Sequence, residues 1–398
     1  MRDTNLPYIG AIPDSWNLAL LGRFTSEVRA PNSDCAESNA LQFKMGNIIS
    51  KSGGDSKYHP ETLEGYNVVL PEDIVINGLN LNYDLKSLRV GQVQEKGVIT
   101  AAYITIRPHG INSGFLKYLL KGFDFLKTFH GMGKGIRLTL SYGELKKMFI
   151  PVPSLPEQRR IADFLDAKCA EIDSILEQTK ASIEEYKKLK QSVITEAVTK
   201  GIRGKRPMKD SGMEYIGEIP EDWAAVAIKT ICTMKAGKNL TTEQILEEGL
   251  YPVYGGNGIR GYYNEYLHDG EYLLVGRQGA LCGNVHKVVG RFWPTEHAVV
   301  TTPSKGVEIP YLFYVLLGAN LNQYSSDTAA QPGLSVKVVQ NVRLPFAPNY
   351  EQQEIAAYLD EKCAAIDSLI ASKESLVTEL EAYKKSLIYE YVTGKKEI

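Results

Sequence analysis

One long segment of this chain occurs twice, and that duplication limits what the chain can fold into more than any other feature. Residues 157–201 begin EQRRIADFLDAKCAEIDSILEQ, and residues 351–395 begin EQQEIAAYLDEKCAAIDSLIAS. The copies align at a constant offset of 194 without a gap, so that Asp166 falls on Asp360. A gap-free repeat of this length indicates the internal duplication of a long helix, around which the rest of the chain is arranged.

A second, shorter repeat precedes each of two divergent middle regions. The segment YIGAIPDSW at residues 8–16 recurs as YIGEIPEDW at residues 215–223, at an offset of 207. Because the helices are offset by only 194, the first middle region is 13 residues longer than the second. The lead-ins and the helices are similar in the two copies, whereas the regions between them diverge. This pattern predicts that the repeated segments have a shared structural role and that the two middle regions do two different jobs of one kind.

The middle regions read as small mixed α/β domains, each with a twisted sheet and a flanking helix or two. Short β-like runs between Gly, Asn, Asp and Pro predict strands, and apolar residues at helical spacing predict helices. In the first region we expect strands at residues 67–70, 74–76 and 103–106, and a helix at residues 113–127. In the second we expect strands at residues 272–275 and 298–301, and a helix at residues 310–317.

The repeated helix carries an apolar seam with alternating steps of four and three residues, which is the period of a coiled coil. The seam extends over about four heptads. A helix of roughly 40 residues, at ~1.5 Å each, gives a rod of about 60 Å. The copies share one chain, so we expect them to pair as antiparallel helices related by a pseudo-twofold axis, with the middle domains at opposite ends. The alternative is that each helix packs on its own domain. The seam positions assigned to helix pairing or partner docking are Leu165, Ile172, Leu176, Ile183, Leu359, Ile366, Ile370 and Val377.

Charge and cysteine content restrict the class of protein. The chain has a formal net charge of −2, divided as +3, +2, −3 and −4 over residues 1–150, 151–207, 208–350 and 351–398. This is not the basic balance of a stand-alone DNA-binding protein, so local patches or partner subunits would have to supply positive charge. Five scattered cysteines predict a reducing compartment. With no apolar run near 18 residues and no signal pattern at residues 1–16, we expect a cytoplasmic protein that contacts no membrane.

These features resemble the specificity subunit of type I restriction-modification systems. The resemblance rests on the paired EQxxIAx(F/Y)LD helices, the YIGxIPxxW lead-ins, and the segments at residues 44–48 and 251–262, and it covers the whole chain. It implies an α+β fold, with two small target-recognition domains separated by a pair of long antiparallel helices. The predicted parts are target-recognition domain 1 (1–150), the first spacer helix and linker (151–207), target-recognition domain 2 (208–344) and the second spacer helix (345–398).

The resemblance also implies a non-catalytic function. Each domain would read one half of a split, asymmetric sequence in double-stranded DNA, and the helices would set the spacer and dock two methyltransferase subunits. Restriction and translocase subunits would join for cleavage. The chain would hold no cofactor, because S-adenosylmethionine, ATP and Mg²⁺ would belong to the partner subunits. Inserting about one heptad after Ile183 would lengthen the spacer and leave the half-sites unchanged.

Two groups of loop residues are candidates for contacting DNA. Asn pairs well with adenine and Arg with guanine in the major groove, and glycine lets a backbone approach closely. Taken alone, such residues are more typical of ordinary turns and solvated loops; the resemblance favours DNA contact. In the second domain the candidates are Tyr254, Gly256, Asn257, Arg260, Arg277, Gln278 and Gln331. In the first they are Lys44, Asn47, Lys57, Lys86, Lys134 and Arg137, the last two for phosphate; Arg89 is a weaker candidate.

Two alternatives from other classes stay open at this stage. Asp73 and Asp84 with Lys86 form a short pattern shared with metal-dependent nucleases, so the chain would be a fused nuclease. A coiled-coil adaptor without DNA specificity is the other. Cys282 and His286 have the spacing of two metal ligands, but no second pair lies near, so we expect no metal site. On the helix seam, Lys190 and Lys384 could set the register or face a partner, but we expect them to snorkel at the edge.

Overall fold

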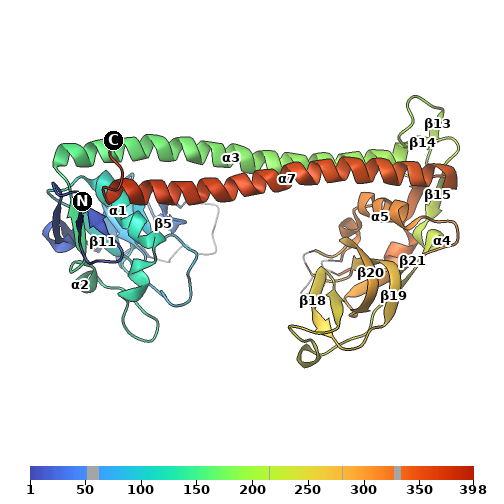
Figure 1. Cartoon of the computed structure of the whole chain (residues 1–398), viewed down its shortest axis with the longest axis horizontal. Helices are drawn as coiled ribbons and strands as arrows, with labels where there is room; N and C mark the ends of the chain where they lie inside the picture. The colour runs from blue at the N-terminus through green and yellow to red at the C-terminus, as the bar shows by residue number, and fades with distance from the viewer. Residues whose placement is uncertain (52–61, 215, 280, 327–332) are drawn as a thin grey trace. The chain divides into compact units, whose positions relative to one another are not determined.

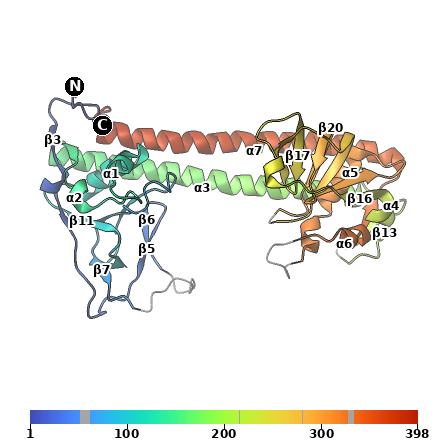
Figure 2. The same ribbon diagram turned by 90° about the horizontal axis from the view of Figure 1, so that it is seen from below.

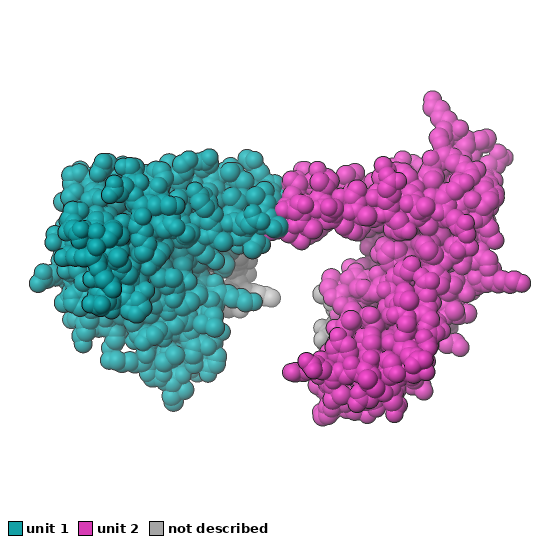
Figure 3. All heavy atoms as spheres, viewed as in Figure 1, with its two compact units in different colours: residues 1–179, 375–398 teal, residues 180–374 magenta. Residues whose placement is uncertain are grey.

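The computed structural model describes residues 1–51, 62–214, 216–279, 281–326 and 333–398. The chain divides into two compact units, which Figure 3 shows in different colours. Unit 1 contains residues 1–179 and 375–398, and unit 2 contains residues 180–374. The two longest helices, α3 (Leu155–Lys200) and α7 (Asn349–Val392), each contribute one segment to each unit.

Unit 1 combines short antiparallel strands with helix α1 (Ser113–Phe125). One sheet has the strand order β4 (Thr25–Glu27), β11 (Ile104–Pro108), β8 (Ile74–Ile76) and β9 (Val90–Gln92). The strand pairs are β1 (Arg2–Asp3) with β2 (Ala11–Ile12), β3 (Asn17–Leu20) with β12 (Phe149–Val152), β5 (Leu41–Lys44) with β6 (Asn47–Ser50), and β7 (Tyr66–Val69) with β10 (Gly97–Thr100). Short helices are η1 (Leu21–Arg23), η3 (Thr128–Gly131) and α2 (Tyr142–Leu145).

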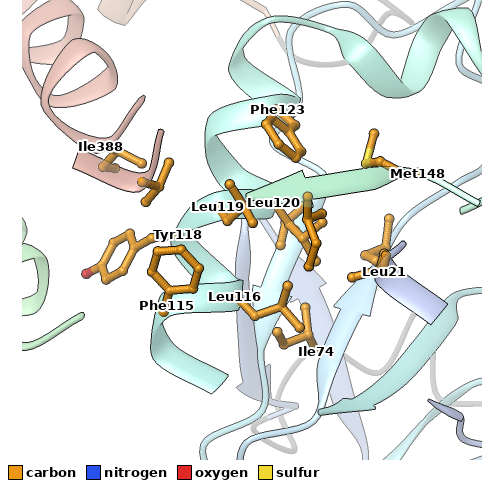
Figure 4. Close-up of a cluster of buried hydrophobic side chains, with 14 of the residues drawn as sticks. Leu21, Ile74, Phe115, Leu116, Tyr118, Leu119, Leu120, Phe123, Met148 and Ile388 are labelled. Carbon is orange, nitrogen blue, oxygen red and sulfur yellow. The ribbon is translucent and has the colours of Figure 1, made fainter. Parts of the chain in front are cut away.

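Helix α1 lies at the centre of the unit 1 core. Its first turn is capped by Asn112, whose side chain accepts a hydrogen bond from the Phe115 amide at 2.8 Å. Figure 4 shows Phe115, Phe123 and their neighbours on α1 among side chains from the sheet, with Ile388 of α7 beside them. Because one buried cluster includes strands, α1, α3 and α7, the helix segments of unit 1 are part of its domain core.

Unit 2 is built on a larger sheet. Its strand order is β16 (Cys232–Ala236), β21 (Ala298–Pro303), β19 (His268–Gly276), β20 (Val285–Pro294), β17 (Tyr251–Gly255) and β18 (Gly258–Tyr263). The strand pairs are β13 (Met208–Asp210) with β14 (Glu218–Pro220), and β15 (Ala224–Ala227) with β22 (Arg343–Phe346). The helices are α4 (Ile228–Ile231), η4 (Thr242–Gln244), α5 (Ile309–Gly318), η5 (Leu321–Tyr324) and α6 (Val336–Asn341).

The sheet of unit 2 buries both faces. Leu273 belongs to the large cluster formed with α5, α3 and α7, whereas the next residue, Leu274, belongs to a smaller cluster with Phe292. Successive residues of a strand point to opposite faces, so the two clusters lie on opposite sides of the sheet. One side is therefore attached to the helices, and the other has a small aromatic core of its own.

Within each unit, the segments of α3 and α7 lie side by side and run antiparallel (Figures 1 and 2). In unit 1, the Lys384 ammonium contacts both carboxylate oxygens of Asp173 at 2.6 Å. In unit 2, Lys190 contacts Asp367 at 2.7 and 2.6 Å. The residues of one pair are the repeat equivalents of those of the other, at the offset of 194. Each seam lysine therefore pairs with an aspartate across the helix pair, at the edge of the seam, a contact that can set the register of the two helices.

The repeated Glu-Gln pair fixes the start of each long helix. In unit 1, the Trp16 indole donates to Glu157 at 3.0 Å, and Gln158 accepts from the Asn112 amide at 2.8 Å. The Gln158 amide group also donates to the Pro153 carbonyl at 2.9 Å. The first turn of α3 is therefore attached to three parts of unit 1: the lead-in at Trp16, the start of α1 at Asn112, and the segment before α3 at Pro153.

Unit 2 repeats the same attachment. The Trp223 indole donates to Glu351 at 2.9 Å, and Gln352 accepts from the Glu308 amide at 3.1 Å. Gln352 donates to the Ala347 carbonyl at 3.0 Å. The duplicated sequence thus specifies duplicated contacts, which is a structural reason for its similarity.

The chain termini and the linker between the repeats occupy matching positions in their units. In unit 1, the Lys395 ammonium donates to the Ile9 carbonyl at 2.6 Å, so the C-terminal tail lies beside the first lead-in. In unit 2, Arg206 of the linker contacts Glu351 at 2.8 Å and lies over the Trp223 ring at 5.3 Å. In each unit, a segment that follows one of the long helices therefore contacts the lead-in or the residue bound to it: the C-terminal tail in unit 1 and the linker in unit 2.

The expected strands and helices of the middle regions are present. Among these expected elements, the bounds of β19 differ most, because it was expected at residues 272–275 and spans His268–Gly276. The added residues 268–271 pair with β20, but their polar sequence gave no strand signal. The four-part division of the chain by residue number stays a prediction, since each compact unit takes parts of both long helices.

Arg206 tests the attachment in unit 2. The Glu351 side chain is 0% exposed, so Arg206→Ala leaves a buried carboxylate without its cation. We expect a loss of about 3–5 kcal/mol in the free energy of unfolding of unit 2, measured by chemical denaturation. Arg203→Ala is the matched control, since Arg203 and Glu354 form an exposed pair worth about 0–1 kcal/mol. Equal effects of the two substitutions would contradict this account.

Candidate nucleic-acid interface

Three loops of unit 2 meet at one end of its sheet. They are the β17–β18 turn, the β19–β20 loop, and the segment between β20 and β21. The Arg277 amide donates to the His297 carbonyl at 2.8 Å, and its carbonyl accepts from the Leu334 amide at 2.8 Å. Backbone hydrogen bonds therefore hold loops from distant parts of the sequence against one another.

Glycine permits this close approach. A Cβ atom on Gly276 would lie 2.0 Å from the Gly256 carbonyl oxygen, and a Cβ on Gly256 would lie 3.2 Å from the carbonyl oxygens of both Gln278 and His297. No side chain fits in the first of these contacts. Gly256 is therefore needed for contacts between loops of the protein itself, and its approach to DNA stays a prediction.

The predicted side chains of unit 2 divide into an outward group and one inward residue. Asn257, Arg260, Arg277 and Gln278 are exposed, and the Asn257 side-chain oxygen accepts from Asn284 at 3.1 Å. Tyr254 is half-buried, its ring 5.7 Å from that of Phe292, and burial raises its pKa. The outward group can offer amides and guanidinium groups to a ligand, whereas the Tyr254 ring packs in the small core.

Unit 1 brings together three loops of its own. The β5–β6 turn rests on the loop after residue 80, because a Cβ on Gly46 would lie 3.0 Å from the Leu88 side chain. That loop in turn contacts the segment between η3 and α2, where Asn82 donates to the Ile136 carbonyl at 3.2 Å. His130 lies 3.3 Å from the Asp84 carbonyl at the same junction. Of the predicted basic residues that the structure describes, Lys86, Lys134 and Arg137 lie on these connected loops, and Lys44 ends strand β5 beside them.

All five predicted side chains of unit 1 that the structure describes are exposed. They are Lys44, Asn47, Lys86, Lys134 and Arg137. Lys134 pairs with Glu144 at 3.0 Å, which reduces its net charge at the surface. Hydrogen bonds from Ser87, together with the Lys86 amide, lower the pKa of Asp84 to about 2. The ionised carboxylate therefore stabilises its own loop by accepting hydrogen bonds from these amides. Lys57 and, in unit 2, Gln331 lie outside the described residues.

The carboxylates of the nuclease alternative have other partners. Asp73 is buried, and the Arg107 guanidinium contacts its two oxygens at 2.8 Å each. Asp84 binds the amides of its own loop. Among residues the structure describes, no group of three or more His, Cys, Asp or Glu side chains is arranged to hold a metal ion. The geometry of Asp73 and Asp84 does not support the fused-nuclease hypothesis.

Two other sequence candidates also have structural roles. Arg89 is 1% exposed, and its guanidinium donates to the carbonyls of Asn77, Leu79 and Asp84 at 2.8–3.0 Å. It therefore organises the loop from inside and is not a DNA contact. Cys282 is buried, with its thiol 3.5 Å from the Asn322 side-chain oxygen.

The helix seam is mostly buried. The buried seam positions are Leu165, Ile172, Leu176, Ile183, Leu359 and Ile366, and the partly buried ones are Ile370 and Val377. Their burial within the units leaves other helix positions to meet any partner. In the described part of the chain, no helix is both long enough and apolar enough to cross a membrane.

Comparison with known proteins identifies the class to which this fold and these loops belong. The type I restriction modification DNA specificity domain matches residues 93–185 and 220–380. The chain belongs to this family, and it is therefore a non-catalytic DNA-specificity subunit of a type I restriction-modification system.

Individual relatives are specificity subunits. The chain is 47% identical over 161 residues to the type I restriction enzyme EcoprrI specificity subunit of Escherichia coli, a match covering 39% of this chain and 38% of that one. It is 26% identical over 430 residues to the MjaVIII specificity subunit of Methanocaldococcus jannaschii, covering 96% and 93%.

Solved structures support the fold. A chain from a study of complex assembly and conformational transition of the type I R-M system aligns with a TM-score of 0.73 at 17% identity, covering 97% of this chain and 100% of that one. The HsdS subunit from Thermoanaerobacter tengcongensis aligns with a TM-score of 0.52 at 16% identity, covering 100% of both chains.

The glycine contact in unit 2 gives a test of the loop surface. In Gly276→Ala the new Cβ displaces the Gly256 carbonyl, so Asn257 and Arg277 lose their relative placement. We expect at least a tenfold loss of affinity for the cognate DNA, because each good base contact contributes about 1–3 kcal/mol and tenfold corresponds to about 1.4 kcal/mol. Binding is measured at fixed salt. Gly204→Ala is the control, because a Cβ there meets open space. Unchanged binding by Gly276→Ala would show that this loop arrangement is not used.

Proposed function

We propose that the chain recognises a bipartite, asymmetric target in double-stranded DNA and directs methyltransferase subunits, and restriction subunits where present, to it. The observation that carries the proposal is that duplicated helix contacts support two loop surfaces of different composition. Unit 1 presents mainly lysine and arginine, with Asn47. Unit 2 presents two amide side chains, Asn257 and Gln278, beside Arg260 and Arg277. Different side chains on equivalent supports would read different half-sites.

The division of contacts follows from chemistry. Lysines offer point charges, so Lys44, Lys86 and Lys134 are proposed to contact phosphates. Asn257 and Gln278 suit adenine, and Arg260, Arg277 and Arg137 suit guanine or phosphate. The net charge of −2 supports a share of the phosphate contacts for partner subunits. Those subunits would also bring S-adenosylmethionine, ATP and Mg²⁺, and the assembly would act in the cytoplasm.

Exposed apolar residues on the long helices favour two copies of one partner. Ile175 and Leu369 are repeat equivalents, and they are 40% and 46% exposed. Leu189 and Tyr383 are likewise equivalent, and they are 48% and 53% exposed. The Asp173–Lys384 contact brings Ile175 to the level of Tyr383 in unit 1, and Lys190–Asp367 brings Leu189 to the level of Leu369 in unit 2. Each unit would dock one methyltransferase subunit there.

Substitution at one patch tests this docking. Tyr383→Glu places a charge on the proposed interface of unit 1, so the purified assembly should contain one methyltransferase subunit instead of two. Mass measurement of the intact assembly reports the number. Tyr383→Phe is the control and should keep both copies. If Tyr383→Glu also keeps both, docking at this patch is refuted.

The proposed function is tested by mapping methylation. Cells that express the chain with its methyltransferase should carry methyl groups at one split, asymmetric motif with a fixed gap, read by genome-wide sequencing of modified bases. Arg277→Ala should relax one half of the motif only, and Arg137→Ala the other. A contiguous or palindromic motif would contradict the proposal. Methylation that does not depend on this chain would favour an adaptor without DNA specificity.

A further inference from the structure

The loop surface of unit 1 exposes large apolar side chains among its basic ones. Met45 is 62% exposed, Tyr83 75%, Leu85 62% and Ile136 94%. Single apolar residues are common on protein surfaces and need no explanation. These four, however, are carried by three loops that contact one another, where the predicted DNA-contacting residues also lie. An apolar group at the tip of such a loop would be placed against the ligand.

Ile136 is held outward by its own turn. The Lys134 and Thr139 backbones exchange two hydrogen bonds, at 3.1 and 2.9 Å, and the Leu138 amide donates to the Gly135 carbonyl at 3.1 Å. Gly135 and Leu138 both have positive φ, at 78° and 41°. A positive φ is costly for leucine, so the contacts around this turn must stabilise it.

Neighbouring loops supply those contacts. The Leu81 amide donates to the Leu138 carbonyl at 3.1 Å, and Asn82 donates to the Ile136 carbonyl at 3.2 Å. The backbone of the turn is therefore fixed on the side facing unit 1, while the Ile136 side chain is left in solvent. Figure 1 shows the segment between α1 and α2, which includes this turn, projecting from the unit.

The surroundings of Ile136 identify what it would touch. Lys134 and Arg137 flank it in sequence, and Lys86 is on the loop that supports it. Cations on both sides of an apolar tip fit a duplex whose phosphates border a groove. In the major groove, the one apolar group on the base edges is the C5 methyl of thymine.

We propose that Ile136 is a specificity-determining residue that contacts a thymine methyl group in the half-site read by unit 1. This inference rests on the proposed function. It adds an apolar contact to the amide and guanidinium contacts already assigned. The interaction would discriminate a T·A pair without a hydrogen bond, through burial of one methyl group against the isoleucine side chain.

Uracil replacement provides the test, because uracil lacks only the C5 methyl. The assembly of this chain with its methyltransferase is titrated, at fixed salt, with duplexes in which each thymine of both mapped half-sites is replaced in turn by uracil. For the wild-type chain, one replacement should weaken binding roughly fourfold, which corresponds to ~0.8 kcal/mol for one buried methylene-sized group. In Ile136→Asn that same replacement should have no effect, and it should lie in the half-site that Arg137→Ala relaxes.

The contact of Ile136 with a thymine methyl group is checked with one control variant. Leu20→Asn alters another exposed apolar residue of unit 1, on β3, and should keep the full uracil effect. A uracil effect that persists in Ile136→Asn, or no effect at any thymine, would overturn the inference while leaving the split target intact. A rise in 2-aminopurine fluorescence on binding, lost in Ile136→Asn, would overturn it in favour of a wedge between base pairs. A wild-type chain that prefers no sequence would overturn both this inference and the proposed function.

Discussion

The first turn of each long helix is the constraint on which the rest of the structure depends. There a glutamate accepts from the lead-in tryptophan, and the next residue, a glutamine, joins the helix to the domain on both sides of it. The buried Glu351 and Gln352 have these partners, as does Gln158, so removing one partner would strand a polar group in the interior. A recognition domain attached in this way cannot rotate freely on its helix.

The loops can differ between the two units because the buried clusters that support them do not depend on the loop side chains. In unit 1, the sheet, α1 and the helix segments share one buried cluster. In unit 2, the large cluster joins the sheet and α5 to the segments of α3 and α7. The described candidates for DNA contact lie on loops, or on the strands that adjoin them, outside these two clusters, where changes of side chain disturb little packing. The two middle regions also differ in length by 13 residues, although the helices that follow them align without a gap. We infer that new half-sites arise through the loops while the helix contacts stay the same.

The frame was predictable from the sequence because its signals are periodic and duplicated. The 3.5-residue seam and the offset of 194 identified both long helices, and the fold followed from them. The partners across the fold were not predictable. Trp16 and Glu157 recur as Trp223 and Glu351, but nothing in a one-dimensional pattern showed that the two residues of each pair touch. The loop surfaces were harder still, since Arg89 looks like any other loop arginine until its burial is known.

We propose, as the central claim, that the paired helices act as a spacer between two domains that each read one half-site. It is tested most directly by inserting one heptad after Ile183 in α3 and a matching heptad after Lys373 in α7, which lies 5.7 Å from the Tyr186 ring across the pair. Seven residues at ~1.5 Å add about 10 Å, or about three base pairs. The methylated motif of this variant should keep both half-sites and gain about three base pairs between them. Altered half-sites, or an unchanged gap with full methylation, would contradict the account.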